Sequence, residues 1–406
     1  MAPHVLNQLT TTPADLSPPR RPRLESIDIL RGTVMVLMAL DHVRDFLSDA
    51  RFNPEDLTRT TVALFFTRWV SHFCAPVFVF LAGTGAFLYG DRGRTRPQLA
   101  WFLLTRGLWL VALEFTLVHL GWFFNCRYEV VTGQVIWAIG LSMVVLAALV
   151  FLPTWVVTAV GVALVCGHNL LDGIDVRELG WFREPYAVMR GGGPLQPWPG
   201  FAFIVAYPLL PWLGVMAAGY GFGAVWRLDQ TSRRRWLLGL GATLTGLFII
   251  LRAVNVYGDP RPWSEQPNGL FLLMSFLNCW KYPPSLLYVL MTLGPAILAL
   301  AWLDRGVGAI GRPLAVFGRV PLFYYLLHLP VIHSAALILA YIQHGETAFL
   351  CNHPLFIGPD ELPDGYGYSL PIVYVIWLGV VLILYPPCAW FAAVKGRRRD
   401  GWLSYF

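Results

Sequence analysis

Ionisable side chains inside long apolar segments are the first feature of this sequence that could support chemistry, because such burial is costly. His42 and Asp45 lie three positions apart, so on a helix the carboxylate can orient the imidazole as a general base. Asp41 and Arg44 form a second pair at the same spacing, and His72 lies in the next apolar segment. The candidate catalytic residues are therefore His42, Asp45, Asp41 and His72.

Each of these residues also has a simpler interpretation. Asp41 with Arg44 can be a salt bridge near a helix end, with His42 directed to the membrane interface. His72, followed closely by Pro76, can be a core histidine bonded to a backbone carbonyl at a kink. Neither interpretation can be discarded on spacing alone.

Three further residues are expected beside this group, in the middle to outer half of their segments, and are candidates for substrate binding: Glu114, His119 and His333. For Glu114 a structural ion pair with an arginine of a neighbouring helix is the favoured alternative. His328 and His333 are five positions apart and point in different directions, so at most one of them is expected to line a site.

A second group consists of arginines near the opposite ends of the apolar segments. Guanidinium groups suit phosphate oxygens, so these arginines could bind an anionic ligand. The alternative, favoured for those in the loop, is plain anchoring on the cytoplasmic side. The candidate ligand-binding arginines are Arg31, Arg106, Arg92, Arg94 and Arg96.

Composition places all these residues in a membrane protein. The chain of 406 residues is 56% hydrophobic and only 13% charged, which cannot build a water-facing surface. We predict an all-α, polytopic bundle of about ten transmembrane helices. The predicted spans are 27–47, 62–89, 101–123, 135–151, 155–167, 201–226, 236–257, 286–303, 321–342 and 370–394. The fifth is short for a crossing, so it either extends through Asn169 and Leu170 or is a re-entrant element.

Loop charges predict the orientation. Lysines and arginines collect in alternate loops, which places both termini in the cytoplasm and the loop 343–369 outside the cytoplasmic membrane. The net charge of +6 is explained by this topology better than by nucleic-acid binding. We expect a disordered tail at 1–22, a transmembrane domain at 23–394 and a basic tail at 395–406, with a homodimer left open.

The cysteines do not indicate a metal site, because their spacing lacks a CxxC pattern. Three of them fall in predicted external loops, where one disulfide could form: Cys126, Cys279 and Cys351. The sequence leaves its pairing open.

The segment RLESIDILRGTVMVLMALDHVRDF at 23–46, followed by FCAPVFVFLAG at 73–83, resembles the opening of the heparan-alpha-glucosaminide N-acetyltransferase catalytic family. FGRVPLFYYLLH at 317–328 is similar to a late helix of the same family and of related bacterial membrane acyltransferases. The most specific part is the S-x-D-x-x-R-G motif of Ser26, Asp28, Arg31 and Gly32.

This resemblance implies an enzyme that takes an acetyl group from cytosolic acetyl-CoA and delivers it to an acceptor, such as the amine of a terminal glucosamine, on the far side of the membrane. The chain also departs from the pattern of this family. Better-known members carry Asn at the position of Asp41, an Asp at that of His72, and a catalytic His in the first external loop, whereas the loop 48–60 has none here.

We therefore expect a transmembrane acyltransferase that moves an acetyl or other acyl group to an amino or hydroxyl group of a glycan or small molecule, directly or through an acyl-histidine. Its expected partners are the lipid bilayer and this external acceptor. The alternative is a proton-coupled transporter or permease for a small solute, because intramembrane histidines and carboxylates also relay protons. Binding of CoA and release of free thiol separate the two.

Overall fold

The computed structural model describes residues 24–306, 308–354, 357–358, 361–398 and 400–405. The predicted tail 1–22 lies outside them. The helices are α1 (Glu25–Leu47), α2 (Val62–Val70), α3 (Cys74–Gly90), α4 (Arg96–Leu113), α5 (His119–Phe123), α6 (Val135–Leu149), α7 (Thr154–Gly167), α8 (Arg183–Tyr186), α9 (Leu209–Phe222), α10 (Gln230–Val254), α11 (Gly269–Leu277), α12 (Leu286–Leu303), α13 (Gly308–Arg319), α14 (Pro321–His344) and α15 (Leu370–Arg397).

Eight helical segments among the described residues are long and apolar enough to cross a membrane, which confirms a multi-pass helical bundle. They are Val62–Gly90, Arg96–Phe123, Thr154–Leu171, Leu209–Arg227, Gln230–Val254, Leu286–Leu303, Pro321–His344 and Leu370–Arg397. The apolar helix α6 is shorter, and α1 is rich in charged residues; with these two the bundle has the ten predicted elements. The fifth element does extend past Gly167, through a 3₁₀ turn to Leu171.

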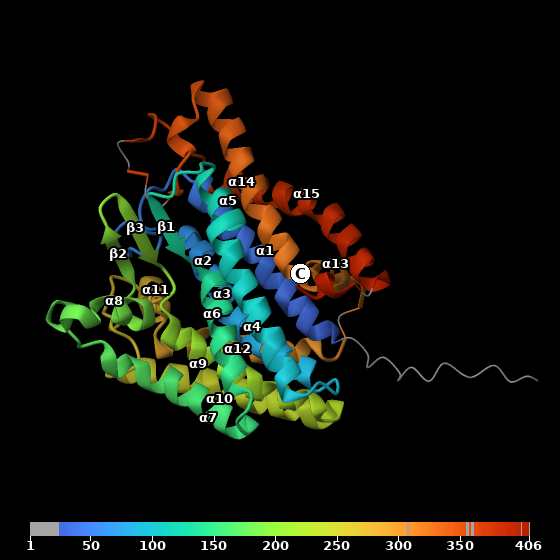
Figure 1. The fold of residues 1–406 in the computed structure, drawn as a ribbon. Helices are drawn as coiled ribbons and strands as arrows, with labels where there is room; N and C mark the ends of the chain where they lie inside the picture. The colour runs from blue at the N-terminus through green and yellow to red at the C-terminus, as the bar shows by residue number, and fades with distance from the viewer. Residues whose placement is uncertain (1–23, 307, 355–356, 359–360, 399, 406) are drawn as a thin grey trace, which may run out of the picture.

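One predicted boundary is wrong. Residues Phe201–Val205 were expected to open the sixth span, but they form strand β3, and the helix α9 begins only at Leu209. Strand β3 pairs in parallel with β1 (Val130–Gly133) and antiparallel with β2 (Gly193–Trp198). This three-stranded sheet lies to one side of the bundle (Figure 1). An apolar stretch of five residues does not distinguish a strand from a buried helix end.

Helix α1 runs through the bundle and packs on α3, α12, α13, α14 and α15 (Figure 1). Its contact with α13 is the tightest: a Cβ added to Gly32 would lie 1.8 Å from the carbonyl oxygen of Leu314, and one added to Gly318 would lie 1.8 Å from that of Asp28. Only glycine allows two backbones to approach this closely. Part of the S-x-D-x-x-R-G motif therefore serves helix packing.

We call the end of the bundle that carries the loop 48–61 the outer end, after the orientation expected from the sequence, and the opposite end the inner end. At the inner end, the C-terminal turn Gly401–Tyr405 returns to α4, where the hydroxyls of Tyr405 and Thr105 lie 2.8 Å apart. The basic segment predicted from residue 395 begins inside α15.

Candidate functional site

A chain of alternating charges starts at the outer end of α1. The Arg44 guanidinium donates to Asp41 at 2.8 Å and to Asp45 at 2.7 Å, so the pair predicted between Asp41 and Arg44 is present. Arg68 of α2 also donates to Asp41, on its other carboxylate oxygen. Arg44 and Asp41 are each only 6% exposed. Charges buried this deeply are tolerated because each carboxylate is matched by a guanidinium.

Arg68 carries the chain onward to a residue from the loop 48–61. Its Nε donates to Glu55 Oε1 at 3.2 Å, and the same oxygen lies 2.9 Å from His72 Nε2. Burial disfavours ionisation of Glu55, but its hydrogen bond and electrostatic interaction with His72, together with the Arg68 charge, outweigh burial and hold the pKa of Glu55 well below its usual range. Glu55 is therefore a carboxylate, which can only accept hydrogen bonds.

The ionised state of Glu55 fixes the tautomer of His72. Nε2 must carry the hydrogen that Glu55 accepts, so a neutral His72 has its lone pair on Nδ1. Among the described residues Nδ1 has no hydrogen-bond partner, and the residue is 1% exposed. The Tyr288 hydroxyl donates to the backbone carbonyl of His72 at 2.7 Å and fixes this turn. The geometry is that of a general base oriented by a carboxylate.

A lysine completes the group from the loop between α11 and α12. Lys281 is 6% exposed, and its charge acts on both Asp41 and Glu55. The same loop is tied to the site by Asn278, whose side chain donates to the Glu55 carbonyl at 2.9 Å. We call the following set the outer charge cluster; its three carboxylates and three cations balance: Asp41, Asp45, Glu55, Arg44, Arg68 and Lys281.

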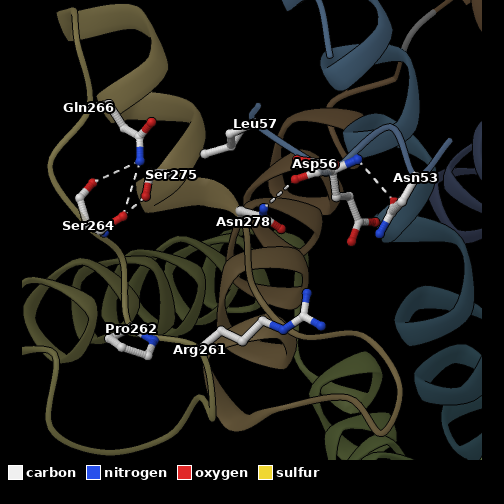
Figure 2. Close-up of a pocket in the computed structure, with 10 residues that line it drawn as sticks. Asn53, Asp56, Leu57, Arg261, Pro262, Ser264, Gln266, Ser275 and Asn278 are labelled. Atoms are coloured by element: carbon white, nitrogen blue, oxygen red, sulfur yellow. Dashed lines mark hydrogen bonds between the residues drawn. The ribbon is translucent and has the colours of Figure 1, made fainter. Parts of the chain in front are cut away.

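A polar cavity of about 380 Å³ opens beside Glu55. Figure 2 shows that its walls come from two distant parts of the chain: Asn53 and Asp56 of the first loop on one side, and Arg261 and Gln266 of the loop after α10 on the other. Asn278 lies between the two walls. Amide, carboxylate and guanidinium groups at one opening suit a polar, hydrogen-bonding molecule.

His42 occupies a different environment. Its Nδ1 lies 3.6 Å from Asp45 Oδ2, too far for a hydrogen bond, and Asp45 is already bonded to Arg44. Its ring packs against Trp122 and His328, with centroid distances of 4.8 and 5.2 Å. His42 and Asp45 are therefore neighbours at the predicted i, i+3 spacing but are not hydrogen-bonded. The imidazole that a carboxylate does orient is that of His72, through Glu55.

The three predicted substrate-binding residues are not brought together at the cavity. Glu114 has no arginine partner in the described part of the chain; its Oε2 accepts from the Trp137 amide at 3.0 Å, at the N-terminus of α6, so the predicted ion pair is wrong. His119 stacks between Phe123 and Tyr128.

Both ring nitrogens of His333 face backbone carbonyls, those of Gly121 at 3.0 Å and Leu350 at 2.9 Å. His333 thus joins α14 to two neighbouring segments, and neither nitrogen is available to a substrate. His328, in turn, lies beside His42.

The predicted arginines divide into two kinds. Arg31 donates to the Gly318 carbonyl at 3.2 Å and lies 3.8 Å from Asp28, and its charge acts on Arg106 across the inner end. Arg96 bonds the carbonyls of Phe151 and Leu152, while Arg94 lies over the Tyr89 ring and Arg92 is exposed. Of these five arginines, Arg31 and Arg106 are the pair close enough to interact.

The described cysteines are all free thiols, and Cys279 is buried. Asn125 donates to the Cys351 carbonyl at 2.7 Å, so the segments that carry Cys126 and Cys351 run side by side. Among the described residues, no group of three or more His, Cys, Asp or Glu is placed to hold a metal ion.

Sequence reasoning missed Glu55 and Lys281. Both come from loops, and neither stands at helical spacing from a histidine. The available signal for Glu55 was its position in the loop predicted to be the first external one, where the resemblance implied a catalytic residue of another type.

Residues 23–251 match the sequence model of the family described as heparan-alpha-glucosaminide N-acetyltransferase, catalytic. The chain belongs to this family. The match covers more than half of the 406 residues and includes α1 to α3, which carry most of the outer charge cluster. No curated protein matches the chain. Membership of this family indicates a membrane acetyltransferase in general.

Proposed function

We propose that this protein transfers an acetyl group from acetyl-CoA, bound from the inner end, to an amino or hydroxyl group of a polar acceptor in the cavity at the outer end. The observation that carries the proposal is the hydrogen bond between His72 and Glu55, 2.9 Å long, because Glu55 also lines that cavity. Membership of the N-acetyltransferase family supports the reaction class.

The donor is a substrate with phosphates, and Arg31 and Arg106 are the cations that would meet them. Arg31 and His42 are eleven residues apart on α1, which corresponds to about 16 Å along the helix axis. A donor held at the inner end would have to span this distance to present its thioester near the outer charge cluster. Arg92, Arg94 and Arg96 would act only as a positive field around the entrance.

The reaction needs one proton acceptor. The amine or hydroxyl group that receives the acetyl group attacks the thioester carbonyl carbon, and its proton passes to His72. The C–S bond breaks, and CoA leaves as a thiolate that takes this proton from His72. Glu55 stabilises the imidazolium that forms on His72.

His42 remains the second candidate for the base, with Asp45 and Asp41 in support. The measurement that distinguishes His72 from His42 is acetyl-CoA-dependent release of free thiol with a glucosaminide as acceptor. We expect His72→Gln to lower turnover about 100-fold or more with acetyl-CoA binding within a few-fold, and His42→Gln to lower it far less. The reverse order would assign the base to His42.

Purified protein that binds no acetyl-CoA and releases no thiol would contradict the transferase and favour a permease. His344→Gln, at the end of α14, is the matched control.

A further inference from the structure

Lys281 is a buried cation whose ammonium group has no hydrogen-bond acceptor or ion-pair partner among the described residues. The residue is 6% exposed, and its Nζ lies over the Tyr282 ring, 5.1 Å from the centroid. A buried ammonium normally has its N–H groups paired, because burying an unpaired charge is costly. Nζ is not sealed from solvent, so a bound molecule can reach it.

The carboxylates of the outer charge cluster are paired without Lys281. Each of the three accepts a hydrogen bond from a guanidinium. Lys281 balances the sum of their charges but forms no ion pair with any of them, and all three lie in the described part of the chain. Its charge nevertheless acts on Glu55 and His72, so it lies beside the proposed base. The ammonium group is therefore available to a ligand at this place.

The choice of lysine at this position is itself informative. The chain has 30 lysines and arginines, and two of them are lysines, Lys281 and Lys395. An ammonium is a compact point charge on a flexible stem, whereas a guanidinium is a flat fork that suits carboxylates and phosphates. In a chain that uses arginine at nearly every other basic position, a lysine inside the site indicates a small target, such as one oxygen atom.

The neighbouring Tyr282 shows what this place does to an oxygen atom. Desolvation raises the pKa of the Tyr282 hydroxyl, but the charges of Lys281 and Arg68 outweigh it and hold this pKa below its usual range. The Tyr282 side chain is 40% exposed, so the place is open to a ligand. Negative charge on an oxygen atom is thus stabilised beside Lys281.

We propose that Lys281 is a catalytic residue that stabilises the oxyanion formed on the acetyl thioester, an inference that rests on the proposed function. When the amine or hydroxyl group attacks, the π electrons of the carbonyl move onto its oxygen, and Lys281 donates a hydrogen bond to this oxyanion. The carbonyl re-forms as the C–S bond breaks and the thiolate leaves. Lys281 keeps its proton throughout, so His72 remains the group that accepts and returns the proton.

The first test measures binding of two unreactive donor analogues to the full-length protein in detergent. S-carboxymethyl-CoA has a carboxylate where the oxyanion forms, and S-ethyl-CoA has no oxygen there. We expect wild-type protein to bind S-carboxymethyl-CoA about tenfold or more tightly than S-ethyl-CoA, because a charge-assisted hydrogen bond forms with one analogue and not with the other. Lys281→Met should lose this preference while its Kd for S-ethyl-CoA stays within a few-fold.

Lys395→Met is the matched control, since it removes the other lysine, near the inner end of α15, and should keep the preference. Absence of the preference in wild-type protein, or its survival in Lys281→Met, overturns the proposal.

Turnover separates contact with the oxyanion from charge balance. Lys281→Met should lower kcat by about 100-fold or more, with the KM for acetyl-CoA within a few-fold. Lys281→Arg keeps the cluster neutral, so we expect a melting temperature near that of wild type but a kcat lowered by about tenfold or more. Full kcat in Lys281→Arg would leave Lys281 a role in charge balance alone and contradict the oxyanion contact. If Lys281→Met does not fold, Lys281→Arg and the wild-type preference decide the question.

Failure of this inference is distinguishable from failure of the proposed function. Wild-type protein that binds neither analogue and releases no thiol contradicts acetyl transfer itself, and the role of Lys281 with it. Wild-type protein that releases thiol, with unchanged kcat in Lys281→Met, leaves acetyl transfer in place and removes only the role of Lys281.

Discussion

Glu55 and His72 hydrogen-bond at 2.9 Å although 17 positions separate them, because the loop 48–61 folds back over the start of the second span. The loop thereby provides a carboxylate inside the bundle. Arg68 and the backbone bond from Asn278 hold it there.

Removing the charge of Glu55 tests this pair. Glu55→Gln keeps the side-chain shape but no longer stabilises an imidazolium, so we expect turnover to fall by about 10- to 100-fold with little change in acetyl-CoA affinity. Thiol release measures turnover, and equilibrium binding measures the affinity for acetyl-CoA. Asp49→Asn, an exposed carboxylate of the same loop, is the control and should behave as wild type. Equal losses in both variants would assign the effect to loop charge rather than to this bond.

The inner arginines are tested through donor binding. Charge-assisted contacts to phosphate contribute about 1.5–3 kcal/mol each, so Arg31→Gln combined with Arg106→Gln should raise the Kd for acetyl-CoA at least tenfold. Arg235→Gln, near the inner end of α10, controls for general electrostatics. An unchanged Kd in the folded double variant would show that the donor phosphates bind away from these two arginines.

Topology is tested with a single new thiol. Ser369→Cys, at the exposed N-terminus of α15, is introduced after replacement of Cys126, Cys279 and Cys351. Because the basic loops favour the opposite side, a membrane-impermeant maleimide should label intact cells. Labelling only after permeabilisation would reverse the assigned orientation.

His353 gives a pH dependence to stability. Burial lowers the pKa of His353 to about 3, although Asp45 partly opposes this effect. In the unfolded chain the ring takes a proton near pH ~6.5, so unfolding gains a proton and the free energy of unfolding declines as the pH falls from about 6.5 to 3. His353→Gln should flatten this decline in thermal melts, and His344→Gln, half-buried at the end of α14, should not. Parallel curves for wild type and His353→Gln would contradict the assignment.

The contact of α1 with α13 predicts a large loss of stability from one methyl group. Gly32→Ala places a Cβ against the Leu314 carbonyl, and we expect the free energy of unfolding to fall by about 1–3 kcal/mol. Gly85→Ala, where a Cβ meets nothing within 4 Å, should leave the melting temperature close to that of wild type. Similar melting temperatures for the two variants would disprove the close packing.

The sequence was sufficient for the bundle, because long apolar segments leave few alternatives in lipid. It was also sufficient for Asp41 with Arg44, since i, i+3 neighbours meet on any helix. It could not reveal Glu55, Lys281 or the role of Glu114, because their partners lie on other elements and depend on tertiary contacts. The strand at Phe201–Val205 was missed for the same reason, because its pairing partner β1 is about seventy residues away.

The balance of the outer charge cluster also has a consequence for how the protein is made. Asp41, Arg44 and Asp45 emerge from the ribosome first, and the loop with Glu55 and the helix with Arg68 follow directly. Until Lys281 arrives, more than two hundred residues later, the three carboxylates face only two cations. Within the cluster, one negative charge therefore stays uncompensated until the loop before α12 has been synthesised and docked.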